Sequence, residues 1–272
     1  MSAILADNGL PGFNRVGIWF NDPGNWHQLL LQIRGHLLYT VIIVVAALLI
    51  GLPIGLLIGH TGRGVFLVAG LANGLRAVPT LGLVILLSVW LSPKIHGKGS
   101  IPWLTDPGGI ANFLAMVVGL VILALPPILT NTYAGVQNVD PEVRDAARGM
   151  GMTGWQVVRQ VEIPCALPLI MSGLRSATLQ VIATVAIAAY LPFLGGLGAY
   201  IRDGIGSLND PQTGYPAMVA AGIVVAVLAV LVDLLLNLVQ RFVVSPGVSG
   251  RFSTRQTPTR TDVPLEAQLT EA

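Results

Sequence analysis

The chain has 272 residues, of which 53% are hydrophobic and 10% are charged, and its mean hydropathy is +0.74. A soluble domain of this length needs far more charged surface, so the composition predicts a membrane protein. The formal net charge of +2 is too small to indicate a nucleic-acid partner, and a single cysteine excludes an internal disulfide framework.

Five apolar segments divide the chain. Spanning a bilayer takes about 20 predominantly apolar residues, so each segment is predicted to be a transmembrane helix. The segments cover residues 37–58, 65–91, 110–129, 166–194 and 217–239. The predicted fold is therefore all-α, with an extracytoplasmic or interfacial segment over 1–36 and a transmembrane domain over 37–242. Residues 243–272 are rich in Ser, Thr, Pro and Gly and are predicted to be a disordered cytoplasmic tail.

The positions of lysine and arginine predict the orientation, because cytoplasmic loops carry an excess of both. With five spans the two termini lie on opposite sides of the membrane. A cytoplasmic C-terminus places eight of these residues in cytoplasmic loops and tail and five outside. We therefore predict a multi-pass protein of the cytoplasmic (inner) membrane with its N-terminus outside. Trp19 and Trp26 then fall where an interfacial aromatic belt would lie.

A charged loop over residues 140–164 interrupts this apolar chain and carries two helix start signals. Asp140 followed by Pro141 offers an N-cap and a proline at the first helical position. Thr153 with Gln156 three residues later fits a capping box. The loop is therefore predicted to contain two short helices.

Two glycines, Gly149 and Gly151, are predicted to end the first of these helices. In the second helix, Trp155 and Val158 are predicted to supply the apolar contacts. Pro164 and Pro168 follow and are predicted to mark a bend back into the membrane.

The first of these helices carries a narrow apolar stripe of small and medium side chains, formed by Val143, Ala146, Ala147 and Met150. Small residues let a partner helix or groove approach closely, which favours docking of another protein. A basic amphipathic helix can instead lie on the lipid surface. The stripe lacks the large anchors of such surface helices and Asp145 interrupts it, so docking is the favoured interpretation.

The loop resembles the cytoplasmic EAA signature of permease subunits of binding-protein-dependent ABC importers. That signature is Glu-Ala-Ala, three residues, Gly, nine residues, Ile, one residue, Leu-Pro. The matching positions here are Asp145, Ala146, Ala147, Gly151, Val161, Ile163 and Pro164. Asp for Glu, Val for Ile and Ile for Leu are conservative departures that keep the spacing. The stretches VPTLGLVILL (78–87), LPLIMSGLRSATLQ (167–180) and FLGGLG (193–198) are similar to the osmoprotectant branch.

The resemblance covers about residues 37–239 and implies a permease fold with a cytoplasmic coupling helix. In that family the coupling helix sits in a groove of a separate ABC ATPase, and two permease subunits, identical or homologous, pair around a pathway. An extracytoplasmic solute-binding protein delivers glycine betaine, carnitine, choline or a proline-like solute. The seven matching residues would then form the ATPase coupling site, with Asp145 facing the ATPase and Gly151 at the bend. The chain itself would hydrolyse nothing and need no cofactor.

Other residues within the predicted spans are candidates for the pathway. Pro79 breaks the second span, and broken helices are tolerated where they line a cavity; an ordinary kink is the alternative. Arg76 lies less than one turn before it, and ionisable groups in lipid are costly. The glycine-rich FLGGLG, with Gly195, Gly196 and Gly198, is predicted to be non-helical and to form either a mouth or a flexible connection.

Two further features of the spans leave alternatives open. Gly51, Gly55 and Gly59 give small-xxx-small spacing, which allows close packing within the subunit or between two permeases. Asp233 in the last span could couple an ion gradient or simply pair with an arginine.

The motifs that are missing also exclude functions. The sequence has no G-x-x-x-x-G-K-[ST] loop and no H-E-x-x-H, and its four histidines lack metal-ligand spacing. The chain is therefore not expected to bind ATP through such a loop or to hold a metal ion. The remaining alternatives to a permease are an ion-coupled secondary transporter of a small solute, with Asp233 as its coupling site, and an intramembrane enzyme or scaffold.

Overall fold

The structure is a computed structural model that describes residues 13–92, 109–191, 194–208 and 214–245. The described part consists of helices and the turns between them, and the predicted tail over 243–272 lies almost wholly outside it. The elements are α1 (Phe13–Asn21), α2 (Pro23–Thr61), α3 (Val65–Ala77), α4 (Thr80–Leu91), α5 (Gly109–Gln137), α6 (Pro141–Gly149), α7 (Gly154–Val157), a π-helical turn η1 (Val158–Glu162), α8 (Ile163–Ala188), α9 (Leu197–Gly206) and α10 (Tyr215–Val243).

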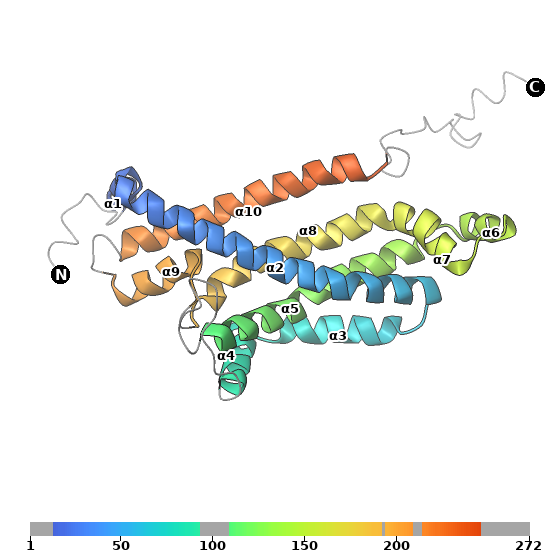
Figure 1. Ribbon diagram of the computed structural model, residues 1–272, viewed down its shortest axis with the longest axis horizontal. Helices are drawn as coiled ribbons and strands as arrows, with labels where there is room; N and C mark the ends of the chain where they lie inside the picture. The colour runs from blue at the N-terminus through green and yellow to red at the C-terminus, as the bar shows by residue number, and fades with distance from the viewer. Residues whose placement is uncertain (1–12, 93–108, 192–193, 209–213, 246–272) are drawn as a thin grey trace, which may run out of the picture.

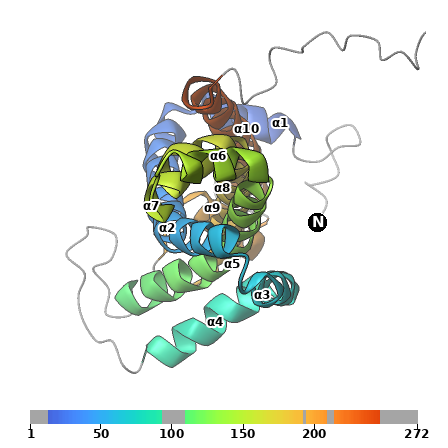
Figure 2. The same cartoon turned by 90° about the vertical axis from the view of Figure 1, so that its right-hand side faces the viewer.

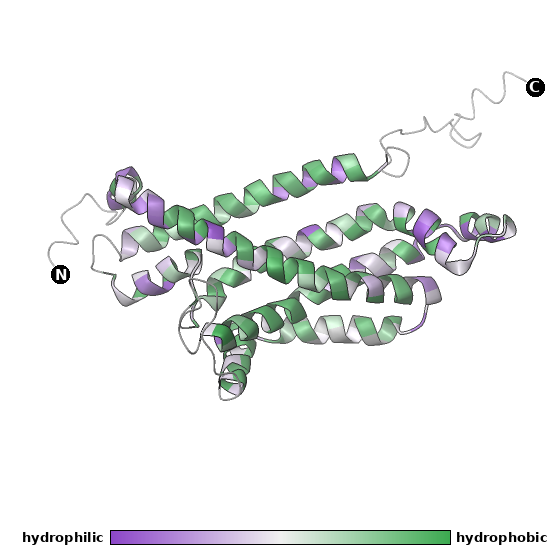
Figure 3. Ribbon diagram, viewed as in Figure 1, coloured by the Kyte–Doolittle hydropathy of each residue, from purple (hydrophilic) through white to green (hydrophobic). Residues whose placement is uncertain are grey.

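Four helical stretches of the described part are long and apolar enough to cross a bilayer. They are α2, α5, the continuous stretch Gly154–Ala188 and α10. In Figure 1 they run along the long axis of the molecule, and Figure 3 shows that their surfaces are mainly apolar. The prediction of an all-α membrane fold is confirmed.

The second predicted span, residues 65–91, consists of two helices, and the predicted break at Pro79 is confirmed. The helix stops at Ala77, Val78 and Pro79 adopt extended backbone, and a new helix begins at Thr80. Proline cannot donate to the preceding turn, and it drives the residue before it out of the helical region. Consequently α3 runs along α5 while α4 turns across the long axis, and both lie on one flank of the bundle (Figures 1 and 2).

The two ends of the bundle differ in composition. At one end, which we call the α6–α7 end, the loop between α5 and α8 projects beyond the long helices (Figure 1). The C-terminal end of α10 lies on the same side, whereas α1 and α9 lie at the opposite, α1–α9 end. Since α1 and the far end of α10 lie at opposite ends, the chain crosses the bundle an odd number of times, with α3 and α4 together making one crossing.

Glycine holds α2 directly against α5. A Cβ added at Gly55 would lie 2.7 Å from Cβ of Thr132, and one at Gly59 would lie 2.6 Å from Cβ of Val136. Gly51 faces the same helix one turn earlier. The small-xxx-small spacing therefore serves packing within this chain, because it allows the two backbones to approach closely.

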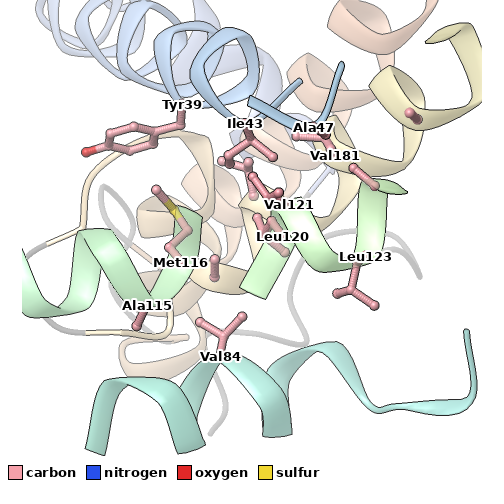
Figure 4. Close-up of a cluster of buried hydrophobic side chains, with 14 of the residues drawn as sticks. Tyr39, Ile43, Ala47, Val84, Ala115, Met116, Leu120, Val121, Leu123 and Val181 are labelled. Atoms are coloured by element: carbon pink, nitrogen blue, oxygen red, sulfur yellow. The ribbon is translucent and has the colours of Figure 1, made fainter. Parts of the chain in front are cut away.

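The main hydrophobic core lies between α2, α4, α5 and α8, where the side chains are almost fully excluded from solvent. Figure 4 shows α2 and α4 contributing side chains from either side of α5. The labelled members are Tyr39, Ile43, Ala47, Val84, Ala115, Met116, Leu120, Val121, Leu123 and Val181. This packing fixes α5 at the centre of the bundle.

The α1–α9 end has two features that the sequence analysis did not predict. First, α2 begins at Pro23, capped by Asp22, so the helix crosses the predicted boundary between residues 36 and 37. Second, Trp19 is buried in a smaller cluster joining α1, α2, α9 and α10, with its ring 5.8 Å from that of Tyr200. The interfacial-belt position predicted for Trp19 is therefore wrong, whereas Trp26 is exposed.

Candidate functional site

The loop at the α6–α7 end is built from the start signals seen in the sequence. Asp140 caps α6 by accepting a hydrogen bond from the Glu142 amide at 2.9 Å. Gln156 Oε1 accepts from the Thr153 amide at 2.7 Å at the start of α7. Between the two helices Gly151 has φ of +86°, in the left-handed region that favours glycine. The predicted caps at Asp140 and Thr153 and the predicted bend at Gly151 are therefore confirmed.

The outer surface of this loop is apolar and exposed. The side chain of Met150 is 73% exposed and that of Trp155 is 69% exposed, and Val143 is exposed beside them. Of the predicted stripe, Ala147 alone is buried against the bundle, while Ala146 faces outward. Trp155 also lines an apolar groove beside α2, so its role in supplying apolar contacts stays a prediction. The loop offers a surface that lacks a partner within the described chain.

The polar rim of this surface is also exposed. Asp145 and Arg148 lie one turn apart on α6 with 3.6 Å between Oδ1 and Nη1. An exposed pair of this kind adds little stability, about 0–1 kcal/mol. Both side chains are therefore free to form other pairs with a docking protein.

Beneath the loop lies a buried carboxylate that the sequence analysis did not single out. The side chain of Glu162 is 0% exposed, and His60 Nδ1 lies 2.9 Å from its Oε2 and 3.0 Å from its Oε1. Arg144 Nε lies 3.2 Å from Oε1 on the other side. Arg144 also donates to the carbonyl oxygen of Val136 at the end of α5. The four residues come from α2, α5, α6 and η1, and this cluster is called the Glu162 node below.

Glu162 ends the π-helical turn that joins α7 to α8. Single π turns inside α-helices are rare and often occur at functional sites. Val161 and Ile163 are half-buried on either side of Glu162, and Pro164 follows directly after the π-helical turn. The helical stretch continues from Gly154 through Pro164 and Pro168 to Ala188; the bend back into the membrane at these prolines stays a prediction.

The pathway candidates fall in two separate places. Pro79 is exposed at the break between α3 and α4, and the side chain of Arg76 lies outside the described part. The glycines instead pack on α2 and α8: the Gly196 amide donates to Gln32 Oε1 at 2.5 Å, and Gly198 is buried against α8. Since α9 begins at Leu197, the prediction that FLGGLG is wholly non-helical is wrong; Phe193 lies outside the described residues.

A cavity of about 370 Å³ opens beside these glycines at the α1–α9 end. Its lining mixes polar and apolar side chains from α2 with the backbone before α9. The lining residues are Gln28, Leu31, Gln32, Arg34, Gly35, Tyr39, Gly195 and Gly196. The cavity is large enough for a small solute, so Gly195 and Gly196 remain candidates for a mouth.

Asp233 in α10 is paired with Arg175 in α8. Two guanidinium nitrogens donate to its two carboxylate oxygens, Nη2 to Oδ2 at 2.5 Å, in a bidentate arrangement. Arg175 Nη1 also donates to Asn237 Oδ1 at 2.8 Å. Of the two alternatives that the sequence left open, the arginine pair is the one observed.

Comparison with known proteins identifies the family. The model of the family described as "Binding-protein-dependent transport system inner membrane component" matches residues 51–245. The chain belongs to this family. The match runs from the glycine face of α2 to the end of α10 and includes the whole of the α6–α7 loop.

Relatives within this family are named for osmoprotectants. The glycine betaine/carnitine/choline transport system permease protein OpuCB of Bacillus subtilis (strain 168) is 31% identical over 226 residues, which is 83% of this chain and 93% of the relative. The carnitine transport permease protein OpuCD of Listeria monocytogenes serotype 1/2a (strain 10403S) is 34% identical, over 76% of this chain and 82% of the relative. The predicted resemblance to the osmoprotectant branch is confirmed.

A solved structure confirms the fold. An inward-facing form of the MetNI methionine ABC transporter matches with a TM-score of 0.63 at 22% identity, over 82% of this chain and all of the matched chain. With the long apolar helices, family membership makes this chain a multi-pass component of the inner membrane. Its relatives are permease subunits, which is a non-catalytic role.

Proposed function

We propose that this chain is the permease subunit of an ABC importer that moves a small osmoprotectant into the cell, driven by ATP hydrolysis in a separate subunit. The observation that carries the proposal is the exposed apolar surface of Val143, Met150 and Trp155 on a capped, projecting loop. Burying such side chains against a partner contributes about 25 cal/mol per Å² of apolar surface. A groove on an ATPase would supply that partner.

The coupling site is proposed to follow the EAA pattern. Asp145 and Ala146 face outward toward the ATPase, Ala147 seats α6 on the bundle, and Gly151 makes the bend. Val161, Ile163 and Pro164 then carry the chain back into α8. This assignment places the α6–α7 end in the cytoplasm, with the C-terminal end of α10 on the same side and the N-terminal segment outside.

An ABC importer of this kind also needs a second permease subunit and a solute-binding protein. A second permease, identical or homologous, would complete the pathway, and an extracytoplasmic binding protein would deliver the solute. The pathway would be lined near Arg76, Pro79, Gly195, Gly196 and Gly198. The names of the relatives favour glycine betaine, carnitine or choline as the solute. The pairing of Asp233 with Arg175 leaves the described spans poor in free charge, which suits a solute of low net charge.

Two measurements test this proposal. Uptake of labelled glycine betaine, carnitine, choline and proline is compared in strains with and without this gene at high osmolarity. Uptake should depend on the gene, require ATP and survive ionophores. Gradient-driven uptake without ATP would instead establish the secondary transporter. Undiminished uptake of all four solutes, in a strain with no second such system, would remove the osmoprotectant assignment and leave the permease assignment untouched.

The docking surface is tested separately by co-purification with the ATPase. Trp155→Glu places a charge in the exposed apolar surface and should abolish co-purification while the permease still inserts into the membrane. Trp26→Glu is the matched control, because Trp26 is an exposed tryptophan at the opposite end of the bundle. Equal recovery of the ATPase with both variants would contradict docking at this loop.

A further inference from the structure

The Glu162 node joins the exposed loop to the transmembrane bundle. Among the described acidic residues Glu162 is fully buried, while the others are exposed or half-buried. A buried carboxylate is stable only when cations and hydrogen-bond donors surround it. His60 and Arg144 meet this requirement from opposite sides, and they belong to α2 and α6. The charge of Glu162 therefore ties two elements that are far apart in the sequence.

On the loop side, α6 has few attachments to the bundle. In the nine residues of α6 Ala147 is buried and Arg144 is half-buried, while the other side chains are exposed. Arg144 contacts the Glu162 carboxylate and the carbonyl oxygen of Val136. A movement of α6 is therefore transmitted to the bundle by the contacts of Arg144 and by the packing of the buried Ala147 side chain.

On the bundle side, His60 stands in the last turn of α2, which ends at Thr61. The glycines of α2 hold this same part of the helix against α5, with Gly59 next to His60 in the sequence. A force on His60 therefore acts on α2 and α5 together. The π-helical turn places Glu162 between this unit and α6.

We propose that Glu162 is a positioning residue for transport, which acts through His60 and Arg144 to make α2 follow the movements of α6. Separating the two helices would leave the fully buried carboxylate of Glu162 without one of its two polar partners, which is costly. The helices therefore keep their spacing when the loop moves. This inference rests on the proposed function, since it assumes that an ATPase moves α6.

A role confined to stability gives a different expectation. Loss of a stabilising contact lowers the amount of folded complex, so uptake and ATP hydrolysis fall together. Loss of a positioning contact lowers the amount of solute moved for each ATP hydrolysed in the complexes that do assemble. The ratio of uptake to hydrolysis therefore separates the two roles.

The experiment uses the complete complex of permease, ATPase and binding protein reconstituted in proteoliposomes, with labelled glycine betaine, carnitine and choline as the transported probes. Glu162→Gln keeps the size of the side chain and removes its charge. We expect it to lower the ratio of uptake to ATP hydrolysis by about fivefold or more, the usual scale of coupling between sites. Glu162→Asp keeps the charge and should restore part of the ratio. Asp203→Asn is the control, because Asp203 is an exposed carboxylate at the α1–α9 end.

His60→Gln provides an independent variant that decides the matter if Glu162→Gln does not assemble. It should lower the ratio as well, and the double variant should lose no more than Glu162→Gln alone, since both act through one contact. An unchanged ratio in His60→Gln, or uptake and hydrolysis falling in proportion in every variant, would overturn the inference. If the unmodified complex shows no ATP-driven uptake, the proposed function fails first and the inference fails with it.

Discussion

Replacing Gly198 by alanine tests whether this glycine serves packing or the pathway. Gly198 lies in the first turn of α9, and an added Cβ would stand 2.1 Å from the carbonyl oxygen of Ala186 and 2.6 Å from Cβ of Ala189. Contacts under 3.0 Å essentially never occur at a Cβ, so the two helices must separate by about 0.9 Å (3.0 minus 2.1). The obstacle includes backbone of α8, which cannot rotate away.

The change in unfolding free energy of Gly198→Ala has two opposing contributions, overpacking and helix propensity. Overpacking of this kind costs about 1–3 kcal/mol, whereas Gly→Ala in a helix gains up to about 1 kcal/mol. Gly206→Ala is the matched control in α9, because an added Cβ there meets nothing within 4 Å. We expect Gly198→Ala to be about 2 kcal/mol less stable than Gly206→Ala, which lowers the unfolding midpoint by about 4–8 °C.

Thermal unfolding of the detergent-solubilised permease, followed by tryptophan fluorescence, measures this difference. Uptake in proteoliposomes is measured on the same preparations. Equal midpoints for the two variants would refute the packing argument. Equal midpoints with lost uptake in Gly198→Ala alone would instead assign Gly198 to the pathway.

Three further variants test other parts of the structure. Gly151→Val should lower uptake per ATP while insertion stays normal, because its φ of +86° suits glycine; Gly149→Val, at a position without positive φ, should change this ratio far less. Arg175→Gln and Asp233→Asn should each unfold at lower temperature than the double variant, because each leaves one ionic group without its partner in the membrane. Gly59→Ala should lose about 1–3 kcal/mol of unfolding free energy, measured by thermal unfolding, because of its contact with α5; an unchanged midpoint would contradict that packing.

Local signals predicted local structure correctly. The caps at Asp140 and Thr153 depend on residues two or three positions away, so the sequence contains everything that fixes them. The break at Pro79 follows in the same way from the ring of one residue. The spacing of the α2 glycines predicted close packing but left its partner open.

Contacts between distant segments could not be predicted. His60 and Glu162 are 102 positions apart, and Arg175 and Asp233 are 58 apart, with no pattern in the sequence that pairs them. The helix of α9 was missed for a related reason: glycine has a low helix propensity, and burial of Leu197 against neighbouring helices overrides it. Glu162 occupies the variable position of the EAA pattern, so the motif itself gave no reason to select it.

The length of α2 determines how far the protein stands above the lipid. Its 39 residues extend about 58 Å, whereas the hydrocarbon core of a bilayer is about 30 Å thick. With the predicted span 37–58, about 33 Å long, in that core and along the membrane normal, residues 23–36 would extend about 21 Å beyond it. The headgroup layer on each side is only about 5–7 Å thick. On that prediction the α1–α9 end would stand above the membrane surface, and a protein arriving from that side would meet side chains of α1, α2 and α9 before it meets lipid.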